Sequence, residues 1–353
     1  GLVGSEMCIR DREKLLATLT SGMRLRHSQR EVNILKEQVE LLSGQNSSEG
    51  DIIGESPAMQ EVFTTINKLS STDANILILG ENGTGKDVIA RLLYRCSPRY
   101  GKPFVTIDLG SIPEQLFESE LFGFEKGAFT DAKKSKAGRM EVATNGTLFL
   151  DEIGNLSLPM QSKLLTAIEK RQINRLGSTQ AVPIDVRLIC ATNADIRQLV
   201  DEGNFRQDLL YRINTIEIHI PPLRERGNDI ILLAEYFLQR YARKYKKDMR
   251  GLTREAKNKL LKYAWPGNVR ELQHTIERAV ILGDGSLLKP ENFLFHASPK
   301  QRKEEEMILN LEQLERQTIE KAMKLSEGNI SRAAEYLGIT RFALYRKLEK
   351  LGL

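Results

Sequence analysis

The feature that most constrains this chain is a glycine-rich segment, Gly80–Val88, with the sequence GENGTGKDV. A strand-like apolar run, Ile76–Leu79, precedes it, and a helical pattern, Val88–Arg95, follows it. This order predicts a P-loop, in which backbone N–H groups and a helix N-terminus cradle phosphates while Lys86 reaches the terminal ones. The predicted phosphate-binding residues are Gly80, Glu81, Asn82, Gly83, Thr84, Gly85, Lys86, Asp87 and Val88.

Acidic side chains predict the rest of a triphosphate site. The generic motif ends in Ser or Thr, but here the position is Asp87, whose carboxylate is an oxygen ligand that Mg²⁺ accepts. A second apolar run, Thr147–Leu150, ends in Asp151 and Glu152. Because buried parallel strands deliver functional side chains at their carboxyl ends, we expect Asp151 to hold Mg²⁺. We expect Glu152 to orient and deprotonate the attacking water.

Composition excludes several other classes of protein. The chain has 353 residues, of which 41% are hydrophobic and 28% charged, as in ordinary globular proteins. Its net charge of +5 is too small to identify a partner. Three cysteines without C-x-x-C spacing and four scattered histidines argue against disulfides and a zinc site. Apolar runs fall short of the roughly 18 residues of a membrane span, and we find no signal peptide, so we expect a cytoplasmic protein.

Alternating patterns predict an α/β fold in which helices sandwich a parallel sheet. The strand-like runs are Ile76–Leu79, Phe104–Ile107, Thr147–Leu150, Val186–Cys190 and Ile216–Ile220. After Pro221 the chain reads as helices only. The predicted organisation is a non-native scar at 1–12, a helical linker at 13–50, the α/β subdomain at 51–221, a helical subdomain at 222–297, a linker at 298–310 and an all-helical module at 311–353.

The first 50 residues stand apart from these domains. Residues 1–12, GLVGSEMCIRDR, resemble the read-through translation of a sequencing adapter, so they are excluded from the fold. Farther on, Leu25, Val32 and Val39 recur every seven residues. This spacing suits a two-stranded coiled coil and an amphipathic helix packed on its own domain about equally.

A series of sequence blocks carries a specific resemblance. In chain order they are GENGTGKD, ESELFGFEKGAFTDA, GTLFLDEI, FRQDLLYRIN, PPLRERGNDI and WPGNVREL. With them the chain, from about Ile52 to Leu353, resembles the NtrC family of sigma-54-dependent transcription activators, also called bacterial enhancer-binding proteins. The resemblance implies an AAA+ ATPase that uses ATP and Mg²⁺, a helical lid, and a C-terminal Fis-type helix-turn-helix domain.

The most diagnostic block contains Gly127–Ala132, GAFTDA. In the family the corresponding loop contacts sigma-54, which implies this role for Phe129 and Thr130. An exposed Phe-Thr tip flanked by small residues is a poor core element and suits a partner contact. Without the resemblance, a surface turn would be the simpler interpretation.

Two positions depart from the family pattern. Asp131 stands where the motif has Gly, so it reduces backbone freedom and adds a charge near the sigma-54 contact. Asp108 stands where the family often has an Asn that swings against the catalytic Glu. Two carboxylates there would repel each other unless one is protonated or bridged.

The resemblance also implies roles around the nucleotide. Thr192 and Asn193 match sensor I, which bonds the catalytic water or the γ-phosphate, and Arg270 matches sensor II on the lid. Arg206 and Arg212 match two arginine fingers that reach the neighbouring subunit's nucleotide. A permanently charged guanidinium suits the developing phosphoryl charge. Fingers acting in trans imply a ring, and the family implies a hexamer.

The C-terminal segment 328–348 reads as helix, glycine-centred turn and helix, with Ser331 and Thr340 as predicted N-caps. A helix-turn-helix presents the start of its second helix to base edges and its basic flanks to phosphates. The alternative is a small helical bundle with a solvated basic face. The predicted DNA contacts are Thr340, Arg341, Arg346 and Lys347.

Together these features predict an ATP-dependent activator that binds upstream palindromic DNA as a dimer and assembles into a hexamer. It would remodel the closed complex of sigma-54 RNA polymerase holoenzyme through Gly127–Ala132. The alternative is a DNA-binding regulator whose ATPase core serves only for oligomerisation, although Lys86, Asp151 and Glu152 are intact. Residues 13–42 resemble the last helix of a receiver domain, so we expect a response regulator, answering to a sensor kinase, whose receiver is missing from this sequence.

Overall fold

The computed structural model describes residues 52–130, 132–295, 315–316, 318–320, 322–323, 326 and 329–351. The chain divides into two compact units, Gly1–Phe293 and Leu294–Leu353. The predictions for the scar at 1–12, the linker at 13–50, the linker at 298–310 and Asp131 all lie outside the described residues.

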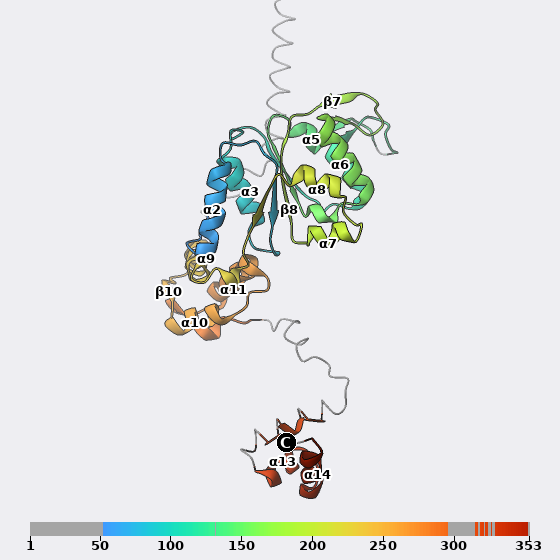
Figure 1. Ribbon diagram of the computed structural model, residues 1–353. Helices are drawn as coiled ribbons and strands as arrows, with labels where there is room; N and C mark the ends of the chain where they lie inside the picture. Colours follow the sequence, from blue (N-terminus) through green and yellow to red (C-terminus); the bar gives the residue numbers. More distant parts are fainter. Residues whose placement is uncertain are drawn as a thin grey trace, which may run out of the picture. The chain divides into compact units, whose positions relative to one another are not determined.

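The larger unit is built on a five-stranded parallel sheet of order β2-β5-β8-β1-β9 (Figure 1). Every predicted strand is confirmed, and the register pairs Asp108 with Asp151 and Leu79 with Thr192. The carboxyl ends of the central strands therefore meet at one edge. The strands are β1 (Ile76–Leu79), β2 (Phe104–Asp108), β5 (Thr147–Asp151), β8 (Arg187–Thr192) and β9 (Ile216–His219).

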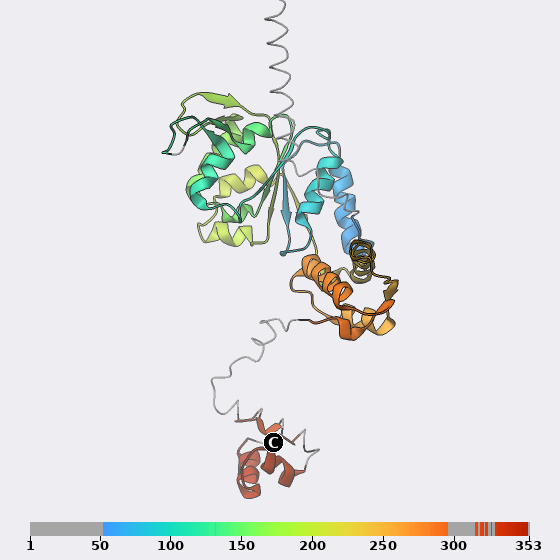
Figure 2. The same ribbon diagram turned by 180° about the vertical axis from the view of Figure 1, so that it is seen from behind.

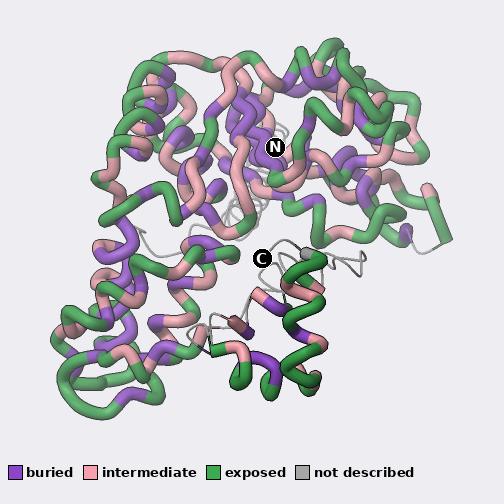
Figure 3. Tube along the Cα trace, turned by 60° about the horizontal axis from the view of Figure 1, so that its bottom comes forward, coloured by how far each residue is buried: buried purple, intermediate pink, exposed green. Residues whose placement is uncertain are grey.

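Helices cover both faces of the sheet (Figures 1 and 2). One face carries α2 (Pro57–Leu69) and α3 (Lys86–Arg95). The other carries α4 (Glu114–Phe122), α5 (Arg139–Val142), α6 (Leu158–Lys170), α7 (Ile196–Asp201) and α8 (Gln207–Ile213). Ile189 packs toward the first group and Leu188 toward the second, so each strand contributes to two core layers. The interior strands β1, β5 and β8 are consequently buried over most of their length (Figure 3), whereas the edge strand β9 is only partly buried.

The segment after β9 is mostly helical, with one addition that the sequence did not predict. The two-residue strands β10 (Gly251–Leu252) and β11 (Leu287–Leu288) pair in parallel. The prediction of helices only is wrong here, because strands this short leave no alternation to detect. Among the described residues, no helix combines the length and apolarity that crossing a bilayer requires. The helical elements are η2 (Leu223–Glu225), α9 (Asp229–Tyr245), α10 (Arg254–Lys262), α11 (Asn268–Leu282) and η3 (Pro290–Asn292).

The smaller unit contains α13 (Ile330–Tyr336) and α14 (Arg341–Leu351). They pack against helical residues at 315–316, 318–320 and 322–323 through Ile319, Ala334 and Leu344. Thr340 caps α14, because its Oγ1 accepts the N–H of Ala343 at 3.3 Å. Ser331 is not the cap of α13. Asn329 takes that place and accepts the N–H of Ser331 at 3.1 Å, because the helix begins earlier than predicted and Asn caps as well as Ser.

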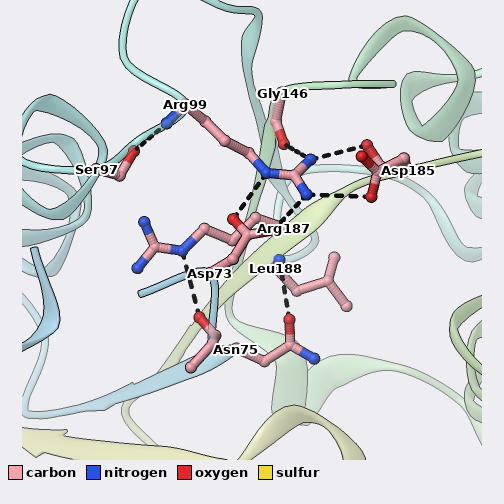
Figure 4. A network of polar contacts seen from close by, with 9 residues as sticks. Asp73, Asn75, Ser97, Arg99, Gly146, Asp185, Arg187 and Leu188 are labelled. Carbon is pink, nitrogen blue, oxygen red and sulfur yellow. Dashed lines mark hydrogen bonds and ion pairs between the residues drawn. The ribbon is translucent and has the colours of Figure 1, made fainter. Parts of the chain in front are cut away.

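A polar network ties the sheet together at the edge opposite the strand carboxyl ends (Figure 4). The Arg99 guanidinium bonds the carboxylates of Asp73 and Asp185 and the carbonyl oxygen of Gly146. The neighbouring Arg187 is 1% exposed, and its Nε donates to the carbonyl of Ala74 at 3.3 Å. Within the described residues, neither of its Nη atoms has a hydrogen-bond partner, and burial lowers its pKa.

These two arginines should affect stability in opposite ways. Arg99→Met should lower the free energy of unfolding by about 3 kcal/mol, since it breaks several charge-assisted hydrogen bonds. Arg187→Met should leave that free energy unchanged or raise it, since it removes a buried and incompletely paired charge. Urea unfolding followed by circular dichroism measures both. Equal losses in the two variants would contradict this account.

Candidate functional site

The P-loop lies between β1 and α3, as predicted. Gly83 and Gly85 adopt left-handed conformations with φ of +78° and +96°, which glycine takes at little cost. Lys86 begins α3 and is buried; its Nζ donates to the carbonyl of Gly80 at 3.0 Å and lies 3.6 Å from Glu152 Oε1. Because α3 begins here, its first N–H groups are free to bind an anion.

The strand ends bring the predicted acids beside this loop. Glu152 follows β5 in a left-handed conformation, φ +57°, and its Oε2 accepts the backbone N–H of Asn193 at 3.4 Å. Thr192 is 1% exposed and its Oγ1 accepts the N–H of Ala194. The catalytic Glu candidate is thus held between the P-loop lysine and the end of β8. Asn193 reaches it through the backbone, and the Thr192 hydroxyl bonds locally.

Asp151 has an unusual proton affinity. Burial raises its pKa to about 6, and the nearby carboxylates of Glu152 and Asp108 add to the rise, while Lys86 opposes it. Asp108 turns its Oδ1 to the N–H of Gly110 at 2.9 Å. A backbone N–H group therefore fixes the orientation of the Asp108 carboxylate.

The lid helix α11 rests directly on the P-loop. The carbonyl of Gly83 accepts the N–H groups of Val269 and Arg270 at 2.9 and 3.3 Å. Asn268, buried and with φ +51°, donates from its amide to Glu81 Oε2 and to the carbonyl of Asn82, both at 3.0 Å. A Cβ at Gly83 would lie 2.4 Å from the carbonyl of Gly267, so only glycine permits this contact.

Glu81 and Asn82, predicted to bind the nucleotide, thus contact the lid. Arg224 completes the contact with a two-bond ion pair to Glu81, at 2.7 and 3.0 Å. Sequence reasoning missed Arg224 and Asn268. Their signal lay in the blocks PPLRERGNDI and WPGNVREL, which identified the family without indicating which side chains meet the P-loop.

Two further lid residues that the sequence analysis did not select hold the start of the domain. Asp229 is 1% exposed and accepts hydrogen bonds from the N–H of Glu55 and from the N–H and hydroxyl of Ser56. Arg226 is buried and donates to the carbonyl of Thr84 at 2.9 Å. The first described segment, the P-loop and the lid therefore form one connected structure.

The predicted arginine fingers lie on the surface. Arg206 is the N-cap residue of α8, and its guanidinium bonds Asp208 and the hydroxyl of Ser162. Arg212 is exposed in the last turn of α8, and its side chain bonds nothing in the described part of the chain. Arg270 is likewise exposed, at the start of α11. These groups are accessible to a second subunit.

Residues 127–130 and 132 lie in the loop of one hairpin, β3 (Gly123–Phe124) with β4 (Lys136–Ala137). A bridge between Phe124 and Leu176 links it to a second hairpin, β6 (Gln172–Asn174) with β7 (Ala181–Pro183). Phe129 is 43% exposed and rests edge-on against Phe124, with ring centroids 4.9 Å apart. Arg175, at the end of β6, bonds Glu125 beside β3 and so joins the hairpins, and it also bonds Glu141 of α5. The Phe-Thr tip is therefore presented on a braced support.

The predicted DNA contacts lie on or next to α14. Thr340, Arg341 and Arg346 are exposed. The Arg341 guanidinium stacks over the ring of Tyr345, 5.8 Å from its centroid. Lys347 is half-buried and forms an ion pair with Glu315, so it faces a neighbouring helix.

Comparisons with known proteins match both units. Residues 52–219 match the sigma-54 interaction domain, 224–308 the AAA+ ATPase lid domain, and 310–351 the Fis family of bacterial regulatory proteins. The transcriptional regulatory protein ZraR of Salmonella typhimurium is 44% identical over 311 residues, covering 88% of this chain and 70% of ZraR. AlgB of Pseudomonas aeruginosa, a regulator of alginate biosynthesis, is 43% identical over 328 residues, covering 92% and 73%.

Solved structures of a similar protein share this fold. The crystal structure of NtrX from Brucella abortus in complex with ADP has a TM-score of 0.66 and 32% identity, covering 93% of this chain and 76% of that one. NtrX in complex with ATP gives the same TM-score and identity.

Proposed function

Because the chain belongs to the sigma-54-dependent transcriptional activators, which join an AAA+ ATPase to a Fis-type DNA-binding domain, we propose that hydrolysis at its P-loop moves Gly127–Ala132 against sigma-54 polymerase. The observation that carries this proposal is the approach of Glu152 Oε1 to Lys86 Nζ, 3.6 Å. It brings a base candidate to the residue that would hold the terminal phosphates of ATP.

Each residue of the site has a proposed task. Backbone N–H groups from Gly83 to Val88 bind the phosphates of ATP, and Lys86 binds the terminal ones. Glu152 takes a proton from the attacking water, and the backbone N–H of Asn193 at the end of β8 holds its carboxylate.

Mg²⁺ fits the donors at this site. Among the described residues no group of three or more His, Cys, Asp or Glu side chains could hold a metal. Mg²⁺ in nucleotide sites needs only one or two carboxylates, with phosphates and waters completing the shell. Asp151 and Asp87 would supply those carboxylates, and the ion would neutralise charge on the phosphates.

Affinity for Mg²⁺ and ATP should therefore fall at low pH. The pKa of Asp151 is about 6, so below this pH the carboxyl group is mostly protonated and must lose its proton before it can bind the metal. This cost weakens binding by up to about tenfold for each pH unit below 6. Titration calorimetry between pH 5 and 8 measures this. Asp151→Asn, which has no proton to lose, should show only the dependence of the nucleotide phosphates; identical profiles would contradict the assignment.

The loop is connected to the site through α4. This helix follows the end of β2, where Asp108 lies, and ends at Phe122, one residue before the hairpin that supports the loop. A displacement at the end of β2 would thus be transmitted to the loop along α4, which is a rigid helix. The ion pair between Glu125 and Arg175 would carry the second hairpin with it.

Arg206 and Arg212 are proposed to complete the site of an adjacent subunit, which requires a ring, and we propose a hexamer. Mixing Arg206→Ala subunits with Lys86→Ala subunits should then restore part of the ATPase activity that each lacks. Steady-state phosphate release across mixing ratios measures the rescue. An absence of rescue at every ratio would exclude fingers in trans.

The C-terminal unit would bind palindromic sites upstream of the promoter as a dimer, and Thr340, Arg341, Arg346 and Lys347 are its proposed contacts. We place the protein in the cytoplasm, where its DNA and polymerase partners are. A receiver domain preceding residue 13, controlled by a sensor kinase, would regulate the ATPase.

In vitro transcription from a sigma-54 promoter tests the whole proposal. Open complexes should form with ATP and not with a non-hydrolysable analogue. Equal opening with both would favour the alternative, in which the ATPase core serves only for assembly.

A further inference from the structure

The start of α14 carries an aromatic side chain that the predicted DNA contacts omit. Phe342, in the first turn of α14, is 83% exposed, more than any other large hydrophobic side chain among the described residues. A single exposed hydrophobic residue is common on protein surfaces. The significance of Phe342 therefore depends on its neighbours and on the element that carries it.

The packing of α14 fixes the direction of this side chain. Leu344 is fully buried and Leu348 half-buried against the other helices of the unit. At about 100° per residue, Phe342 points roughly 160° away from Leu344, and Arg346 lies on the same outer face one turn later. The face opposite the core thus begins with a phenylalanine followed by an exposed arginine.

A second arginine is fixed beside Phe342. The Arg341 guanidinium stacks over Tyr345, which lies one turn along α14 and is itself 44% exposed. This contact restricts Arg341 and spares it part of the entropy lost on binding. Two cations, Arg341 and Arg346, therefore flank one apolar ring at the helix start.

This arrangement matches the chemistry of a DNA major groove. Phosphates line the groove edges and attract the flanking guanidinium groups, while thymine alone presents a methyl group on the groove floor. A phenylalanine in the first turn of a recognition helix occupies the part of that helix that meets base edges. An acidic or purely apolar partner surface would leave either the ring or the two cations unmatched.

We propose that Phe342 reads the C5-methyl group of a thymine and so sets one position of the DNA sequence that this protein selects. The inference rests on the proposed role of α13 and α14 as a DNA-binding helix-turn-helix. It assigns to Phe342 the base discrimination, with the flanking arginines providing affinity.

Selection from a random-sequence duplex library with the full 353-residue chain identifies the DNA sequence that the protein prefers. The wild-type protein should select a thymine at one position of each half-site. Phe342→Ala should lose that preference and Phe342→Leu should keep part of it. Tyr336→Ala, which removes a 59% exposed ring from α13, is the matched control and should select the wild-type site.

Replacing that thymine by deoxyuridine then removes only the methyl group. Wild-type binding should weaken about fourfold per half-site, the value of one buried methyl, while Phe342→Ala should bind both duplexes equally. Equal wild-type binding to both duplexes, or an unchanged preference in Phe342→Ala, would overturn the inference and leave DNA binding intact. Failure of the wild-type chain to select or bind any duplex would overturn the DNA-binding role as well.

Discussion

Replacing Glu152 with Gln is expected to reduce ATP hydrolysis by about 10²- to 10⁴-fold, the usual contribution of a general base. The amide keeps the size of the side chain but accepts no proton from water. Binding of ATP should persist, because Lys86 and the N–H groups of the P-loop are unchanged. Since Glu152 Oε1 lies 3.6 Å from Lys86 Nζ, removing its charge also frees the lysine for phosphate.

Phosphate release and nucleotide binding by fluorescence anisotropy measure the two properties separately. Glu277→Gln is the matched control, because Glu277 pairs with Lys244 on the lid and should leave both properties unaltered. Hydrolysis at the wild-type rate in Glu152→Gln would remove Glu152 from the mechanism. Loss of nucleotide binding would indicate instead that this carboxylate supports the P-loop structurally.

Replacing Thr130 with Ala is expected to abolish promoter opening while ATPase activity changes less than about twofold, as for a surface substitution. The reason is the position of the tip, which projects from braced hairpins and touches no residue of the P-loop site in the described part of the chain. Phe129→Ala should have the same effect, because it removes the apolar contact surface.

Promoter opening can be followed by permanganate reactivity of the melted strand, with ATPase assayed in the same reactions. Thr64→Ala, at an exposed position of α2, is the matched control. Normal promoter opening by the Thr130→Ala variant would show that a surface other than this loop acts on the polymerase. A parallel loss of ATPase would instead place Thr130 in the hydrolytic machinery.

Local patterns in the sequence were sufficient to predict the strands of the sheet and the position of the P-loop. All five strands of the sheet are confirmed. Interior strands such as β1 and β5 are buried on both faces and are therefore nearly continuous apolar runs, whereas the edge strand β9 alternates apolar and polar residues. The glycine loop was recognisable because its backbone geometry restricts which residues fit. The cap of α13 was misplaced, since both Asn329 and Ser331 suit that role and only the helix start decides between them.

Partnerships between distant side chains could not be predicted in this way. Asn268 meets Glu81 across 187 positions of sequence, and nothing in either neighbourhood specifies the other. Lys347, one of the proposed DNA contacts, forms an ion pair with Glu315, and the sequence around neither residue predicts that pairing. Burial and turn chemistry are local properties of a chain, whereas the pairing of charges follows from how separate elements pack.

The shared carbonyl of Gly83 has one more consequence. Two backbone N–H groups of α11 donate to the loop that would wrap the phosphates, so a ligand that shifts this loop also tilts the helix. Conversely, a molecule that binds the helix and fixes its tilt changes the affinity of the loop for its ligand by an equal free energy. An antibody fragment against the outer face of α11 would therefore act as an inhibitor or an activator without contacting Lys86 or Glu152.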